Sequence, residues 1–361
     1  MAIDPTHLDI SAASLTRRSF VGRAAALVAA SSPAAALLTG CGAQSGSVKK
    51  ESGGRQKVTF LTITPLSLSF AAEIMADTGG HFRKEGLDVS IQPTRGSAQA
   101  IQLVLSNRAL LTRAGAIETI EAIASKDAPL RGVGMLMQGE TIRFVSSRRD
   151  PLTRPADFKG KTIGIPSKKG TSETTLDLVL RAGHVDPGDV ERQVVGLSPG
   201  VYELVQRGRL DAYIVGVDVA VTLQKKNVGA VLFDPSTVVT AGQGYMVTER
   251  SLEQNRDTLQ RYLRAVRAGV DSILADDRLD TTLKSMRTKY HFPTLADDAV
   301  AKESIRQVKK AWLAAGRDNV LKTVPERWKK TYDELVALGE IKGGADPSKW
   351  YTNELADRAA A

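Results

Sequence analysis

Two charged residues, Arg113 and Asp218, are the main candidates for binding a small molecule. Arg113 follows the apolar run Ala109–Leu111, and a guanidinium can hold a carboxylate or sulfonate through two parallel hydrogen bonds. Asp218 has the matching place in the second half of the chain and could accept a hydrogen bond from an amine or a ring N–H. Each also has a structural interpretation, Arg113 as an exposed loop arginine and Asp218 as a cap before the helix that starts at Val219.

Backbone N–H groups at two expected helix starts are further candidates for binding an anion. Gly96-Ser97 and Gly170-Thr171-Ser172 each combine a hydroxyl with free N–H groups where a helix begins. A plain helix cap is the alternative for both. The other candidates are Thr64, Leu66 and Ser67 after the first strand, Ala114 beside Arg113, Glu140 before a crossover strand, Gly216 before Asp218, and Tyr245, which could stack on a planar ligand or pack in the core.

Several kinds of chemistry find no support. His81, His184 and His291 are far apart and lack a cysteine partner, so we expect no metal site, no cofactor and no enzymatic activity. Glu118 and Glu121 could perform acid–base chemistry, but a solvated helix face is the simpler interpretation. The net charge is +9, yet the basic residues are scattered, which favours a basic surface for anionic ligands or lipid headgroups and not for nucleic acid.

The elements that must position these residues alternate between strand and helix. We expect strands at 58–63, 87–91 and 161–166, and helices at 70–79, 98–105 and 173–182. This order predicts an α/β fold with mostly parallel sheets flanked by helices. From Glu249 the pattern becomes helical, with an amphipathic stripe at 259–274 and further helices at about 297–315 and 325–338. A chain of 361 residues exceeds what one core usually supports, so two lobes are expected.

The N-terminal residues predict export and lipid attachment. Arg17-Arg18 before an alanine-rich run resembles a twin-arginine signal, and Leu38–Cys41 resembles a bacterial lipobox that contains the chain's one cysteine. We expect a signal peptide at 1–40, a lipid on Cys41 and a flexible tether at 41–57. A transmembrane anchor is the alternative, but residues 24–38 are too short and alanine-rich to span a core of ~30 Å well.

Three segments resemble the solute-binding proteins of ABC importers for nitrate, sulfonates, taurine and thiamine-pyrimidine precursors. They are Gly80–Val89, with its Glu-Gly-Leu-x-Val ending, Asp157–Gly164, with Lys-Gly-Lys, and Gly208–Ala212, which reads Gly-x-x-Asp-Ala. The sequence departs from the family at Asn107–Leu110, where Gly-x-Ala-Asp is usual, and at Gly216–Asp218, where a Trp-x-Pro loop is usual. The cysteine-rich and histidine motifs of the related pyrimidine synthases are missing.

The resemblance implies a two-lobed periplasmic-binding-protein-like fold of type II, with a helical C-terminal region. Residues 58–145 and 240–361 would form lobe 1, and residues 146–239 would form lobe 2. The implied function is an extracytoplasmic lipoprotein that captures a small organic anion between the lobes and delivers it to an ABC permease. We expect a monomer that is anchored to the outer face of the cytoplasmic membrane. The alternatives are a binder of a pyrimidine precursor or other planar heterocycle, an enzyme acting on such a solute, and a lipid-anchored sensor.

Overall fold

The computed structural model describes residues 54–360, apart from 167, 169–170, 227–228 and 240, and these residues belong to one compact unit. The predicted signal peptide, Cys41 and Gly170 lie outside the described residues. Strand β1 begins at Gln56, inside the last two residues of the predicted tether. Within the described ranges, no helix combines the length and apolarity needed to span a bilayer.

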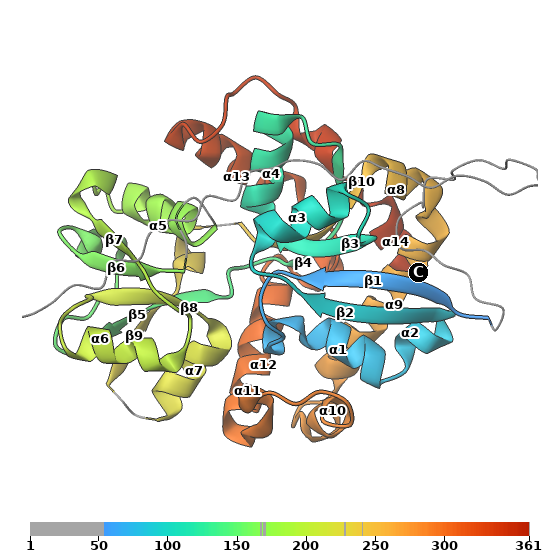
Figure 1. Ribbon diagram of the computed structural model, residues 1–361, viewed down its shortest axis with the longest axis horizontal. Coiled ribbons are helices and arrows are strands. Elements are labelled where there is room, and N and C mark those ends of the chain that lie inside the picture. The colour runs from blue at the N-terminus through green and yellow to red at the C-terminus, as the bar shows by residue number, and fades with distance from the viewer. Residues whose placement is uncertain (1–53, 167, 169–170, 227–228, 240, 361) are drawn as a thin grey trace, which may run out of the picture. The chain divides into compact units, whose positions relative to one another are not determined.

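The first sheet is built from the first four strands of the chain and from β10, the last strand (Figure 1). Strand β1 pairs in parallel with β2 and β3, and β10 returns antiparallel between β3 and β4. The order is therefore β2-β1-β3-β10-β4, in which β10 alone runs against the others. The strands are β1 (Gln56–Thr62), β2 (Leu87–Pro93), β3 (Leu111–Gly115), β4 (Leu130–Met137) and β10 (Gln243–Thr248).

The second sheet has the same plan in the middle of the chain. Strand β6 pairs in parallel with β7 and β8, and β5 is antiparallel to β8 and β9, which gives the order β7-β6-β8-β5-β9. The expected mostly parallel α/β architecture is confirmed, whereas the lobe boundaries at 145/146 and 239/240 stay a prediction. The strands are β5 (Ile142–Ser147), β6 (Thr162–Ile165), β7 (Glu191–Val194), β8 (Ala212–Gly216) and β9 (Ala230–Phe233).

Helices connect the strands and make up most of the chain after β10, as the apolar periodicity predicts. The connecting helices are α1 (Ala71–Thr78), α2 (His81–Lys84), α3 (Ser97–Leu105), α4 (Ala116–Lys126), α5 (Thr171–Ala182), α6 (Tyr202–Gln206) and α7 (Val217–Lys225). The later helices are α8 (Glu249–Gln254), α9 (Arg256–Ala275), α10 (Asp280–Met286), α11 (Pro293–Ala296), α12 (Asp298–Leu313), α13 (Pro325–Leu338) and α14 (Glu354–Ala360).

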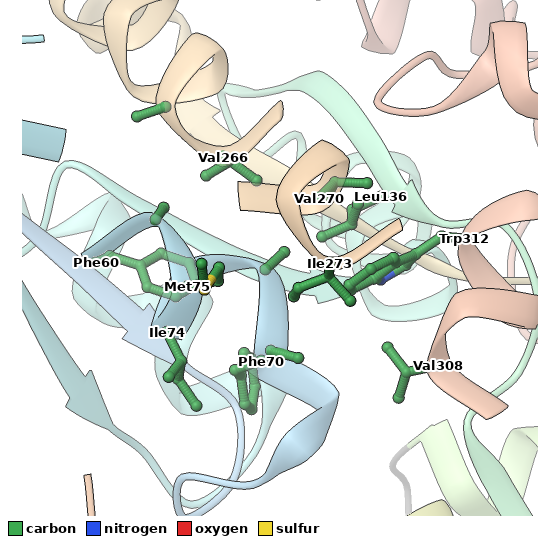
Figure 2. Close-up of a cluster of buried hydrophobic side chains, with 14 of the residues drawn as sticks. Phe60, Phe70, Ile74, Met75, Leu136, Val266, Val270, Ile273, Val308 and Trp312 are labelled. Carbon is green, nitrogen blue, oxygen red and sulfur yellow. The ribbon is translucent and has the colours of Figure 1, made fainter. Parts of the chain in front are cut away.

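The largest hydrophobic cluster lies where α1 and α9 cover the first sheet. Figure 2 shows Val266, Val270 and Ile273 of α9 beside side chains of α1 and of β1, all of them buried. The two helices approach closely at Gly269, because a Cβ atom there would lie only 2.5 Å from the Ala72 carbonyl oxygen. This packing fixes the sheet whose strand ends carry the candidate site.

Candidate functional site

Glu118 connects three segments at the end of strand β3. It lies in the first turn of α4, and its carboxylate accepts hydrogen bonds from the Ser97 hydroxyl of α3 and from the backbone N–H of Thr171, the first residue of α5. The Ser97 hydroxyl in turn accepts the Gly115 N–H over 3.5 Å. A Cβ at Gly115 would overlap the Glu118 carboxylate, so a larger residue there would require the Glu118 side chain to move. A residue attached to the first sheet thereby contacts the helix that follows β6 of the second sheet.

The environment of the Glu118 carboxylate is largely dry. Its Oε2 atom is buried and has no hydrogen-bond partner among the described residues. Burial raises the pKa of Glu118, and hydrogen bonds from its own backbone N–H, from Ser97 and from Thr171 oppose that shift. Burial, followed by the neighbouring charge of Glu118, also raises the pKa of Glu121 to about 7. The two glutamates therefore lie on a half-buried face of α4, which is less solvated than the sequence suggested.

Glu140 is a second buried carboxylate close to Glu118. Its side chain is 6% exposed, and in the part of the chain that the structure describes its carboxylate has no hydrogen-bond partner. Burial and then the charge of Glu118 raise the pKa of Glu140 to about 8, although Arg143 opposes this. Arg143 is itself paired with Asp234, Nη2 to Oδ2, over 2.8 Å. Glu140 therefore keeps a proton at neutral pH and can both donate and accept a hydrogen bond.

Asp218 lies at the start of α7, next to the segment that carries Glu140. The Val217 N–H donates to the Thr141 carbonyl oxygen over 2.8 Å, which attaches the start of α7 to the residue after Glu140. The Asp218 carboxylate accepts the Val219 N–H and lies 3.4 Å from the Thr294 hydroxyl of α11. Burial raises the pKa of Asp218. The helix begins at Val217 with Gly216 at its N-cap, so Asp218 lies in the first turn and the expectation that it caps a helix starting at Val219 was wrong. One of its oxygens also contacts the helical region after β10.

We call Glu118 and Glu140, with Ser97 and Thr171, the carboxylate site. Asp218 is joined to the neighbouring segment through the hydrogen bond from the Val217 N–H to the Thr141 carbonyl oxygen. These acidic residues lie in segments that connect strands of the two sheets. Burial away from water is the main cause that raises the pKa of each of them. Such groups recognise N–H donors, protonated amines or the mixed donor and acceptor edge of a heterocycle. No group of three His, Cys, Asp or Glu residues in the described chain could hold a metal ion.

Arg113 does not take the role predicted for it. It lies inside β3, and its side chain is completely buried. Its Nη2 donates to the Ser69 carbonyl oxygen over 2.6 Å, its Nε lies 3.5 Å from Glu73 Oε1, and its guanidinium lies 4.4 Å from the centre of the Phe70 ring. The reason is strand alternation: Arg113 points to the face that α1 and α9 cover. Its charge is therefore paired with Glu73 inside the protein.

Tyr245 and Ala114, which were predicted to line the binding site with Arg113, are also core residues. Tyr245 pairs with Arg113 across β3 and β10, is fully buried and donates to Glu73 Oε1 over 2.6 Å. Of the two roles expected for Tyr245, packing in the core is the one observed. Its ring is therefore not placed to stack on a ligand. Ala114 is equally buried and leaves only its backbone to contact others.

The remaining predicted positions lie at strand ends or helix starts. Thr64, Leu66 and Ser67 are half-buried in the loop that follows β1, where the Thr64 hydroxyl donates to the Pro65 carbonyl oxygen over 3.1 Å. Gly96 has a φ of 139°, a conformation that favours glycine, and precedes α3. Ser172 and Gly216 are half-buried beside Thr171 and Asp218. Whether any of these residues touches a ligand stays a prediction.

Glu118 is the residue that the sequence interpretation missed. A signal for it exists, because an apolar strand that ends in Gly115 and passes directly into a helix puts the third helical residue at the carboxyl edge of the sheet. In open α/β sheets that edge is where ligands bind. The helical spacing of Glu118 and Glu121 alone carries no such information, since the same spacing occurs on any solvated face.

Known proteins similar to this chain include binding proteins and pyrimidine phosphate synthases. The chain is 23% identical over 310 residues to the riboflavin-binding protein RibY of Chloroflexus aurantiacus, covering 83% of this chain and 86% of that protein. It is 21% identical over 314 residues to the 4-amino-5-hydroxymethyl-2-methylpyrimidine phosphate synthase of Schizosaccharomyces pombe, covering 81% and 84%. The solved alkanesulfonate-binding protein SsuA of Xanthomonas axonopodis pv. citri, bound to MOPS, has a TM-score of 0.64 at 14% identity, covering 82% and 98%.

The solved structure shares the fold, which is the two-lobed α/β fold of periplasmic binding proteins with added C-terminal helices. A family model described as NMT1/THI5 like matches residues 67–278, which is more than half of the chain. ABC-import solute-binding proteins and a pyrimidine synthase both stand among the similar proteins. This chain belongs to the NMT1/THI5-like family.

Proposed function

We propose that this protein is an extracytoplasmic solute-binding protein that delivers a planar nitrogen heterocycle to an ABC import permease. The observation that carries the ligand class is the buried carboxylate of Glu140, which lacks a partner among the described residues. A ligand that pairs with this carboxyl group would supply hydrogen bonds that no described residue supplies. The ligand is therefore expected to bring the missing hydrogen bonds.

The protonation state of Glu140 restricts the kinds of ligand that can pair with it. A carboxyl group with a pKa of about 8 presents an O–H donor and a C=O acceptor side by side near neutral pH. An aminopyrimidine edge, or the imide edge of a flavin, presents the complementary acceptor and N–H donor at the same spacing. Two similar proteins have names that refer to riboflavin and to a pyrimidine phosphate, which are both planar nitrogen heterocycles. Those names support the same class of ligand.

The anionic ligand favoured by the sequence has weaker support. The arginine chosen to bind it, Arg113, is paired with Glu73 in the core, and the charged groups gathered at the site are carboxylates. A sulfonate placed beside Glu118 and Asp218 would be repelled by any of them that is ionised. We therefore rank the heterocycle above the organic anion, which remains the second candidate because the solved SsuA structure holds a sulfonate buffer.

An enzymatic role is the main competing class, because two similar proteins are named synthases. We propose a binding role instead. The single cysteine is Cys41, at the predicted lipidation site, so it offers no nucleophile within the folded lobes. His81, the histidine with a resolved side-chain partner, lies 3.1 Å from the Ser272 hydroxyl on α9, and burial lowers its pKa. It therefore belongs to the helical layer, away from the carboxylate site.

The ligand class can be tested by calorimetry and thermal shift on the purified chain. We expect aminopyrimidines or flavins to bind without turnover, and ethanesulfonate and nitrate to bind weakly. Glu140→Ala should weaken heterocycle binding by roughly tenfold or more, since two hydrogen bonds of about 1 kcal/mol are lost. Glu203→Ala, which removes an exposed carboxylate of the second sheet's α6, is the matched control and should bind normally. A tight sulfonate ligand with no heterocycle binding would refute the proposal.

A further inference from the structure

A closed ring of hydrogen bonds holds the backbone of Glu140. The Glu140 N–H donates to the Ser236 hydroxyl over 3.1 Å, and the Ser236 N–H donates to Asp234 Oδ1 over 2.9 Å. The other Asp234 oxygen lies 2.8 Å from Nη2 of Arg143, whose Nη1 donates to the Glu140 carbonyl oxygen over 3.2 Å. The ring joins the two segments that pass between the sheets, from β4 to β5 and from β9 to β10. The Glu140 side chain takes no part in it.

The Arg143 guanidinium has two carboxylates nearby and forms its ion pair with Asp234. Its side chain is 9% exposed, so the charge needs a partner. The charges of Asp234 and then of Glu140 oppose the lowering of its pKa by burial. Phe144 of β5 pairs with Phe233 of β9. Because this pairing is antiparallel, the next residues along, Arg143 and Asp234, also lie opposite each other.

We propose that Asp234 is a positioning residue that holds the Arg143 guanidinium away from the Glu140 carboxyl group, so that this group stays available for the ligand. The inference rests on the proposed function and deepens it, because it explains how the site keeps a carboxyl that both donates and accepts. When Asp234 is neutral, Glu140 is the other anion that acts on Arg143. Pairing with the guanidinium would then ionise Glu140 and occupy its oxygens.

The surroundings of Glu140 make the position of Arg143 important. The charge of Glu118 raises the pKa of Glu140 and that of Arg143 lowers it. Helix α12 presents two alanines, Ala311 and Ala314, to the neighbouring Gly139. The charged groups on the elements around this segment are Glu118 of α4, Arg143 of β5, Asp218 of α7, Asp234 after β9, and Arg327 of α13, which donates to the Gln138 carbonyl oxygen.

The test follows the ionisation of Glu140 in the full chain by ¹³C NMR of the glutamate carboxyl carbons, with Glu140→Gln used to assign its signal. Wild type should titrate at about pH 8. Asp234→Asn can still accept the Ser236 N–H but lacks the charge, so the midpoint should fall by about one to three pH units as Arg143 pairs with Glu140. Asp234→Glu keeps a carboxylate for Arg143 and should restore the wild-type midpoint.

A double-mutant cycle separates the role of Arg143 from the loss of a negative charge. In an Arg143→Gln background, Asp234→Asn should barely move the midpoint, because no guanidinium is left to pair with Glu140. Asp189→Asn is the matched control, since Asp189 is 45% exposed against 43% for Asp234 and pairs with Lys159 over 3.8 Å. The inference is wrong if Asp234→Asn titrates like wild type, or if the midpoint falls equally in both backgrounds.

Riboflavin and 4-aminopyrimidine are titrated in parallel to connect Asp234 with ligand binding. At pH 7, Asp234→Asn should bind the heterocycle about tenfold more weakly, and the loss should shrink at pH 5, where Glu140 regains its proton. If neither compound binds wild type but the midpoint of Glu140 falls as expected, the proposed function is wrong and the positioning role of Asp234 stands. If a heterocycle binds and the midpoint does not move, only this inference is refuted.

Discussion

The Nε atom of Arg113 lies 3.5 Å from Oε1 of Glu73, and neither side chain has any solvent-exposed area. Glu73 Oε2, Arg113 Nε and Arg113 Nη1 have no hydrogen-bond partner among the described residues. A buried pair of this kind stabilises a fold only as long as both partners are present, because each charge depends on the other. Arg113 is therefore a structural residue.

Replacing Arg113 alone should destabilise the protein. Arg113→Met leaves Glu73 as an uncompensated buried charge, which costs about 3–5 kcal/mol in the free energy of unfolding. Urea titration measures this, and Arg108→Met, at an exposed position in the loop before β3, should change stability by less than about 0.5 kcal/mol. The double variant Glu73→Gln/Arg113→Met should recover part of the loss. A stable Arg113→Met protein with weakened ligand binding would restore the sequence-based role.

Two tyrosines beside this pair provide an internal comparison. The Tyr245 hydroxyl donates to Glu73, whereas the buried Tyr262 hydroxyl has no partner in the described part of the chain. Tyr245→Phe should therefore cost about 1–3 kcal/mol, and Tyr262→Phe should be neutral or stabilising, because it removes an unpaired polar group. Chemical denaturation of the two variants side by side tests this order. Equal losses would show that the hydrogen bond to Glu73 contributes nothing specific.

The sequence predicted the architecture well and the charges at the site poorly. Strand and helix periods depend on side chains within one segment, so the stripe at 259–274 located α9 and the run before Pro65 located β1. The partner of Arg113 lies forty residues earlier on α1, and no local pattern records that contact. Glu118 was misjudged for the same reason, because its burial depends on Thr171, from the second sheet's α5.

The close contact between α1 and α9 predicts that adding one methyl group at Gly269 changes the stability of the protein. Gly269→Ala would improve helix propensity by up to ~1 kcal/mol in an exposed helix. Here the new Cβ would lie 2.5 Å from the Ala72 carbonyl oxygen and 3.0 Å from the Ala76 nitrogen, both backbone atoms. We expect a net loss of about 1–3 kcal/mol, the usual cost of overpacking, in thermal or urea unfolding. A more stable variant would mean that the helices can separate without penalty.

Lipid anchoring is tested at Cys41. Cys41→Ser removes the predicted lipidation site and should move the protein from the membrane fraction to the soluble fraction, because a serine offers no lipid anchor. Ligand binding and unfolding should be unchanged, because Cys41 stands at the start of the predicted tether, ahead of strand β1. Arg17→Lys with Arg18→Lys should separately block export by the twin-arginine route. Retention of the Ser variant in washed membranes would refute the lipoprotein proposal.

Glu140 makes stability depend on pH with a definite sign. Its pKa is raised from 4.5 to about 8 in the folded protein, so between these values the folded state holds a proton that the unfolded state has lost. The stabilising effect of this group is complete below about pH 4.5 and is lost as the pH rises through about 8. Glu140→Gln imitates the protonated form at every pH and should remove this dependence.

The measurement is urea unfolding of wild type and Glu140→Gln at pH 5.5 and pH 9. Wild type should lose about 2–3 kcal/mol more than the variant over this interval, because each unit of pKa shift corresponds to ~1.4 kcal/mol. Glu121→Gln is the comparison for a group whose pKa is raised less, to about 7, and it should remove a smaller part of the dependence. Parallel curves for wild type and Glu140→Gln would mean that Glu140 is ionised at neutral pH. The ligand would then have to be a cation or a pure N–H donor, because an ionised carboxylate can only accept.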